Sequence, residues 1–143
     1  IWVGTRNGLS GFDGKNWITY NSINAPLTDN FVYCLGIDNQ NRKWIGTAKG
    51  GLLIFDGNDW EHFHSANAPF QSDWIRSILF DDVGHSFIGT TAGLYVFDGS
   101  GWKIFNSRNF ALPEDNIYQS ARDKKGDIWI TTAGGGIAKM EFE

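Results

Sequence analysis

The sequence predicts an all-β protein built from one repeated four-stranded unit. Three observations support this fold class: a short phrase returns at a nearly constant interval, turn residues follow it in phase, and the composition disfavours helices. The phrase is Trp-Ile-Gly-Thr or a close variant, and its copies are Ile1–Thr5, Trp44–Thr47, Phe87–Thr90 and Trp129–Thr132. Their aromatic residues are 42, 43 and 42 positions apart. A fixed period of this size indicates an array of one supersecondary unit.

The rest of each unit recurs in the same phase. Each phrase is followed by Gly-Leu or Gly-Ile, and in three periods then by Phe-Asp-Gly, a Trp, a Tyr or Phe, and an x-Pro pair. Six of the seven tryptophans fall on two repeat positions, and only Trp74 lies outside them. The recurrence of so many positions predicts that every period has the same fold.

Composition excludes several other classes. Among 143 residues there are 18 glycines and 15% aromatic residues, and no long apolar stripe has the helical period. The formal net charge of −4 does not favour binding to nucleic acid, which requires a positively charged surface. No run of about 18 apolar residues is present, so we expect no direct membrane insertion of this segment. The single cysteine, Cys34, has no partner for an internal disulfide.

Each period divides into four short strands separated by turns. In the second period the expected strands are 32–37, 43–47, 52–55 and 60–64. The first turn, Asp38–Asn41, has an Asp that can accept bonds from backbone amides and a last residue that tolerates a left-handed conformation. Phe-Asp-Gly between the third and fourth strands is a hairpin signal, because Asp-Gly permits positive φ. The unit is therefore expected to be an antiparallel four-stranded sheet.

Strand 52–55, Leu-Leu-Ile-Phe, is apolar on both alternating faces, so both faces of its sheet must be covered. Four-stranded sheets stacked around an axis meet this need, which predicts a β-propeller segment of about 3.5 blades with a period of 42–43 residues. Residues 1–143 form one such segment. We expect a partial blade at 1–20 lacking its innermost strand, blades at 31–64 and 74–106, and a partial blade at 116–143 lacking its outermost strand. The segment should belong to a longer protein, with the remaining blades of the same propeller as partners.

This pattern resembles the two-component regulator propeller repeat. The residues that carry the resemblance are Trp-Ile-Gly-Thr, Gly-Leu, Phe-Asp-Gly, Trp, Leu-Pro and Asp-x-x-Gly, and it covers the whole chain. The resemblance implies a sensor propeller in the extracytoplasmic, periplasmic part of a bacterial hybrid two-component system, with glycan-derived ligands. The chain departs from the repeat at three places: Thr131 replaces Gly, Met140 replaces Phe, and His85–Phe87 replaces the segment that leads to Trp in other periods. These departures suggest that side-chain packing differs from blade to blade.

Repeated carboxylates are expected to serve turns, and no constellation predicts catalysis, so we name no catalytic residue. His62 and His64 share a strand face but no third ligand is evident, whereas zinc sites use three or four. No metal site and no cofactor are therefore predicted. Cys34 lies on an innermost strand without a partner histidine in phase, and His85 replaces a turn residue and is expected to be exposed.

Recognition is instead expected at one end of the ring, where the loops entering the innermost strands meet the turns between second and third strands. Tyr and Arg are residue types that anchor recognition sites. The candidate ligand-binding residues, called the rim set below, are Tyr33, Arg76, Tyr118, Trp74, Arg6 and Lys49. The alternative is that these aromatics pack between loops while the cations are solvated.

Three functions follow from this reasoning. The leading hypothesis is a noncatalytic sensor or ligand-binding propeller in an extracytoplasmic input domain. The second is a structural or protein-interaction propeller of a bacterial envelope or secretion assembly, binding a protein partner or a second copy. The third, a propeller enzyme such as a lyase or hydrolase, has the least support because a fold does not confer an activity.

Overall fold

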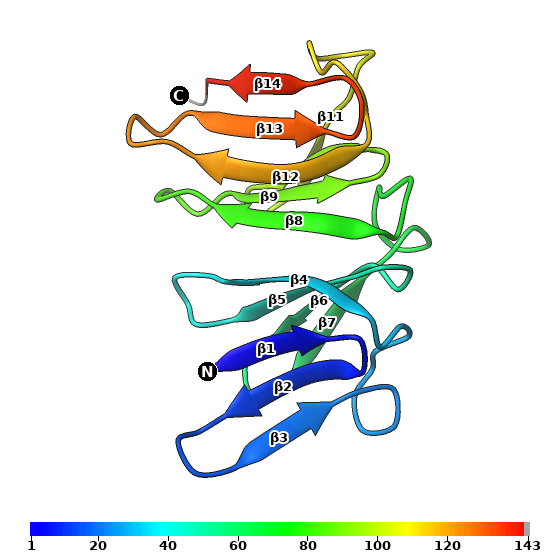
Figure 1. Cartoon of the computed structure of the whole chain (residues 1–143), viewed down its shortest axis with the longest axis vertical. Helices are drawn as coiled ribbons and strands as arrows, with labels where there is room; N and C mark the ends of the chain where they lie inside the picture. Colours follow the sequence, from blue (N-terminus) through cyan, green and yellow to red (C-terminus); the bar gives the residue numbers. More distant parts are fainter. Residues whose placement is uncertain (142–143) are drawn as a thin grey trace.

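The computed structural model describes residues 1–141, and all their regular structure is β (Figure 1). This part of the chain contains no helix that is long and apolar enough to cross a membrane. The last two residues of the partial blade expected at 116–143 lie outside the described residues. The first sheet contains β1 (Trp2–Thr5), β2 (Gly8–Phe12) and β3 (Trp17–Tyr20). The second contains β4 (Val32–Ile37), β5 (Lys43–Thr47), β6 (Leu52–Phe55) and β7 (Trp60–Phe63).

The third sheet contains β8 (Ile75–Phe80), β9 (Ser86–Thr90), β10 (Gly93–Phe97) and β11 (Trp102–Phe105). The fourth contains β12 (Ile117–Arg122), β13 (Ile128–Thr132) and β14 (Ile137–Met140). Every sheet is an antiparallel meander in which consecutive strands pair. The outermost strand of the second sheet ends at Phe63 rather than at His64, because the His64 backbone N–H donates to Asn67 Oδ1 in the following turn.

The sheets are stacked one after another; the second, third and fourth meet along their innermost strands, and β1 of the first sheet lies beside β4 (Figure 1). β4 lies beside β8, and β8 lies beside β12. Three hydrophobic clusters occupy the three interfaces between successive sheets. The all-β fold expected from the sequence is confirmed, and the arrangement fits a β-propeller segment.

The central strand β6 shows why the sequence is apolar on both faces. Leu52 and Ile54 point into the cluster shared with the third sheet, whereas Leu53 and Phe55 point into the cluster shared with the first. All four side chains are buried. Alternate residues of one strand therefore serve two cores, which stabilises the stack through apolar burial on both sides.

The glycine of the repeated phrase allows adjacent sheets to approach closely. A Cβ at Gly89 would lie 2.7 Å from Ile117 Cγ2 of the next sheet, and one at Gly46 would lie 2.7 Å from Ile75 Cγ2. Such distances are below normal van der Waals contact, so a side chain here would push the sheets apart. The innermost strand of the next sheet thus packs directly on the backbone of the second strand.

The expected turn chemistry is confirmed. In the turn after each innermost strand, the last residue has positive φ: 62° at Asn41, 97° at Gly84 and 95° at Gly126. Glycine adopts this conformation readily and asparagine tolerates it. The glycine of the Phe-Asp-Gly hairpin also has a positive φ, which is 113° at Gly57.

Candidate ligand-binding rim

One end of the stacked sheets gathers the loops entering the innermost strands and the turns between second and third strands (Figure 1). Three carboxylates brace these loops. Asp29 accepts from the backbone N–H groups of Phe31 and Lys49 at 3.0 and 2.7 Å. Asp73 and Asp115 instead accept from backbone N–H groups of the preceding loops, those of Ser65 and Ser107. The expectation that the repeated carboxylates serve turns is confirmed for these three by their hydrogen bonds.

Each innermost strand carries a β-bulge close to this end. The pairing with the second strand skips one residue per sheet, and the skipped residues are Tyr33, Arg76 and Tyr118. A bulge inserts an unpaired residue and re-aims its side chain. The side chains of these three rim residues therefore need not follow the regular alternation between the two faces of the sheet.

The bulges bring four of the six rim residues together around one guanidinium. Arg76 Cζ lies 4.4 Å from the ring centroid of Trp74 and 4.6 Å from that of Tyr118. It lies 5.9 Å from the Tyr33 ring, which itself meets Trp74 edge to face at 5.9 Å. We call Arg76 with these three rings the Arg76 cage. Each contact has the geometry of a cation–π interaction.

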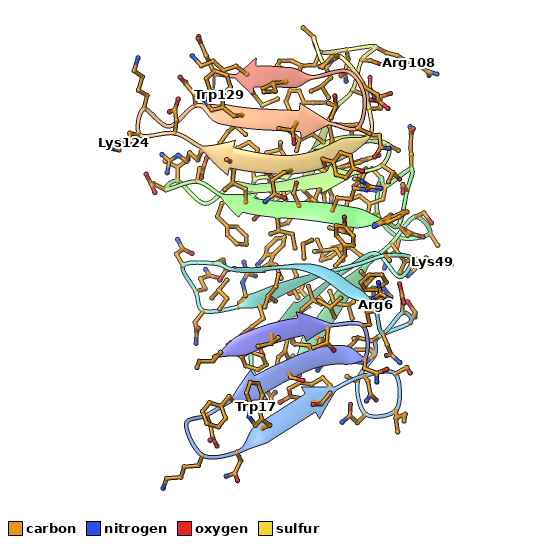
Figure 2. The ribbon with its side chains drawn as sticks, in the orientation of Figure 1. Arg6, Trp17, Lys49, Arg108, Lys124 and Trp129 are labelled. Carbon is orange, nitrogen blue, oxygen red and sulfur yellow. The ribbon has the colours of Figure 1, made fainter. Side chains whose placement is uncertain are left out.

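The other two rim residues lie at the same end of the sheets but outside the cage. Figure 2 shows Arg6 in the β1–β2 turn and Lys49 in the β5–β6 turn. Arg6 Cζ lies 5.2 Å from the Phe31 ring centroid, and Phe31 lies 6.0 Å from Tyr33. Lys49 is exposed and anchors its turn through its backbone N–H. Phe31 therefore links Arg6 to the cage, a role that sequence reasoning did not assign.

The cage contains polar atoms that lack a partner. Within residues 1–141, Arg76 Nε and Nη1 are buried and make no hydrogen bond. The same is true of Trp74 Nε1 and of Asn116 Oδ1, on the loop that enters β12. Buried polar groups are normally paired, so unpaired ones in a native structure call for an explanation.

The remaining chemical candidates have structural roles. His62 Nε2 lies 2.6 Å from the Gly50 carbonyl oxygen, and its ring lies 4.7 Å from that of His64. In the described part of the chain, no group of three or more His, Cys, Asp and Glu side chains could hold a metal ion. Burial raises the pKa of the Cys34 thiol to about 12, so the reactive thiolate is scarce at neutral pH.

His85 is half-buried rather than exposed, which corrects the expectation from its turn position. Its Nδ1 lies 2.6 Å from Asp81 Oδ2. In the second sheet, the equivalent carboxylate of Asp38 accepts from the indole Nε1 of Trp44. The third sheet has Phe87 in place of that tryptophan, and His85 provides the side-chain partner of Asp81 instead. The departure at residues 85–87 is thus a local exchange of hydrogen-bond partners.

Comparison with known proteins agrees with this geometry. The model of the two component regulator propeller family matches residues 111–134. The chain is also similar to the extracellular domain of a hybrid two-component system from B. thetaiotaomicron, with 26% identity and a TM-score of 0.79. That alignment covers 96% of this chain and 19% of the other chain. The search of curated proteins found no match.

Two further solved structures are similar in fold. The extracellular domain of a one-component system from B. thetaiotaomicron has 22% identity and a TM-score of 0.78, over 96% of this chain and 22% of the other. A virginiamycin B lyase from Staphylococcus aureus, crystallised with quinupristin, has 16% identity and a TM-score of 0.67, over 96% and 49%. The chain spans about a fifth of the length of the two B. thetaiotaomicron domains.

The four antiparallel sheets and these likenesses define the class of protein: the chain is a segment of a β-propeller. Over residues 111–134 the chain is similar to the two component regulator propeller family, as the repeat pattern predicted.

Proposed function

We propose that this chain is a noncatalytic part of a sensor propeller in the extracytoplasmic input domain of a bacterial two-component signalling protein. One observation carries the proposal: 96% of the chain aligns at a TM-score of 0.79 and 26% identity with the extracellular domain of a hybrid two-component system. The family match at residues 111–134 supports the same assignment. The likeness to lyases is below 25% identity and supports only the shared fold.

In this proposal the four sheets are blades of one ring that further blades complete. The exposed apolar residues of the two end sheets support this view, since Trp17 and Ile18 in the first sheet and Ile137 in the fourth face solvent here. Large apolar side chains on a sheet face are normally covered. The rim set then lies around one mouth of the ring, where loops carry function on a rigid scaffold.

We further propose glycan-derived ligands for this sensor. The aromatic side chains of the Arg76 cage and the exposed cations Arg6 and Lys49 provide stacking surfaces and hydrogen-bond donors at one mouth. Such a combination of flat apolar rings and polar groups suits a hydroxylated ring ligand.

The test is a calorimetric screen of the complete extracytoplasmic region of the parent protein against a panel of oligosaccharides, paired with a transcriptional reporter of signalling in cells. We expect at least one oligosaccharide class both to bind saturably and to induce the reporter. A folded domain that binds no member of the panel, in cells where none induces the reporter, would contradict the proposal and favour a structural role in the envelope.

A further inference from the structure

The Arg76 cage holds a charged group that has no counter-ion in the described part of the chain. Arg76 is 9% exposed, and its Nε and Nη1 atoms are both buried and unpaired within residues 1–141. The ion pairs of the described chain use other cations, which are Arg42, His85, Arg122 and Lys139. A buried cation is costly unless an anion pairs with it and satisfies its donors. The guanidinium therefore calls for an anionic partner that the described residues do not supply.

Acidic side chains of the neighbouring loops do not fill this role. Asp29, Asp73 and Asp115 precede the three innermost strands, but each carboxylate accepts hydrogen bonds from loop backbone. Asp73 additionally accepts from the Ser65 hydroxyl at 2.9 Å. These carboxylates hold the loops in place and leave the guanidinium unpaired.

The walls of the cage indicate what accompanies the anion. Tyr33 and Tyr118 contact Arg76 and are nevertheless exposed, so parts of both side chains remain available to a ligand. Aromatic rings offer flat apolar surfaces on which a sugar or another ring can stack. They also hold the guanidinium plane in place, which lowers the entropy cost of binding.

Two neutral polar atoms on the loops at this end are also unpaired within residues 1–141. Trp74 Nε1 is an unpaired donor and Asn116 Oδ1 an unpaired acceptor, on the loops that enter β8 and β12. Both atoms are buried, so they add to the polar groups of these loops that have no partner within residues 1–141.

We propose that the Arg76 cage binds the carboxylate of a uronic acid unit in an acidic oligosaccharide. The guanidinium donates a charge-assisted hydrogen bond to the carboxylate, while the sugar ring stacks on Tyr33 or Tyr118. Because Nε and Nη1 are buried, the proposed contact is made by Nη2, which is not among the buried unpaired atoms. The inference rests on the proposed sensor function and specifies its ligand class.

The test measures affinity by calorimetry in the complete extracytoplasmic region. The probes are oligogalacturonates and glucuronate-containing disaccharides, each compared with its methyl ester, which keeps the sugar ring and removes the charge. We expect a uronate to bind and its ester to bind about tenfold to a hundredfold more weakly, as for loss of a charge-assisted bond. Arg76→Lys keeps the charge but loses the planar guanidinium that lies among the three rings, and it should weaken uronate binding about tenfold.

The matched control is Arg108→Gln, which removes an exposed arginine at the same end of the sheets (Figure 2). This variant should bind the uronate like the wild type. If Arg76→Lys and the control behave alike, or if acid and ester bind equally, the inference fails. If only neutral oligosaccharides bind, the inference also fails while the proposed sensor function stands. If no oligosaccharide binds, both fail.

A second variant separates a ligand carboxylate from an acidic side chain of another blade. Arg76→Met fills the cage with an apolar chain. We expect the Tm of the ligand-free protein to stay unchanged or rise, because an unpaired buried charge is removed, while uronate binding is lost. A Tm lowered by several degrees with uronate affinity retained would assign the guanidinium to an internal ion pair and overturn the inference.

Discussion

The two central sheets and the two end sheets contain the same repeat but bury it differently. Trp44 in the second sheet is 1% exposed, whereas Trp129 at the same repeat position in the fourth sheet is 40% exposed. Leu52 is fully buried and its counterpart Ile137 is 66% exposed. The residue types are alike, and Leu9 at this position in the first sheet is also buried, so the difference comes from whether another sheet covers that face. In a stacked array, each unit obtains much of its stability from the units beside it.

The largest expected effect compares the two tryptophans. Trp44→Ala should lower the free energy of unfolding by about 3–5 kcal/mol, because it empties a packed core position between the second and third sheets. Trp129→Ala should cost no more than about 2 kcal/mol, since less apolar surface is buried there. Urea unfolding of the two variants measures the difference. Equal losses would show that position in the stack does not control burial energy.

The next effect concerns the glycine of the repeated phrase, which lies two residues after the tryptophan. Gly46→Ala should destabilise the chain by about 1–3 kcal/mol, because the new methyl group overlaps Cys34 and Ile75. In the fourth sheet this position is already Thr131, whose hydroxyl donates to the Gln119 carbonyl oxygen, and Thr131→Ala should cost less than about 1 kcal/mol.

Gly101→Ala serves as the control for added bulk, since a Cβ at that position would meet no atom within 4 Å. It should change the free energy of unfolding by less than about 0.5 kcal/mol. A similarly small change in Gly46→Ala would contradict the close approach between the second and third sheets.

The smallest effect is a pH dependence at the turn after each innermost strand. The carboxylate of Asp38 accepts from two backbone amides, the Arg42 Nε and the Trp44 indole. Burial alone would raise the pKa of Asp38, but these bonds and the Arg42 charge outweigh it and lower the pKa. In the fourth sheet, a bond from the Trp129 indole and two backbone amides lower the pKa of Asp123.

A carboxyl group whose pKa is lowered on folding stabilises the protein above its unfolded pKa of about 3.9, and this contribution is lost as pH falls through the folded value. Stability measured by urea unfolding should therefore fall below about pH 4. Asp38→Ala should reduce that fall more than Asp123→Ala does, because Asp38 also pairs with Arg42 at 2.7 Å. Acid profiles identical to that of the wild type would exclude both carboxylates as the cause.

Much of the rim could be predicted from the sequence, although its shape could not. Repeat phase places Tyr33, Arg76 and Tyr118 at one equivalent position, and Trp74 stands out as the tryptophan that does not repeat. The sequence indicated the bulges only weakly: the innermost strand β4 has six residues and its partner β5 has five, which leaves one residue unpaired. Nothing in the sequence indicated that one guanidinium would lie among three rings from successive sheets. Whether the rim set binds a ligand stays a prediction.

By itself, the sequence determined the unit: the strands, the turn residues and the all-β class follow from local patterns of period, polarity and backbone preference. Tertiary structure alone decided which copies of a repeated residue are buried, since burial depends on the sheet that packs against them. It also decided the Arg76 cage, because the contacts there join residues from innermost strands more than 40 positions apart. Local patterns specify a sheet, whereas only the stacking of sheets specifies what lies between them.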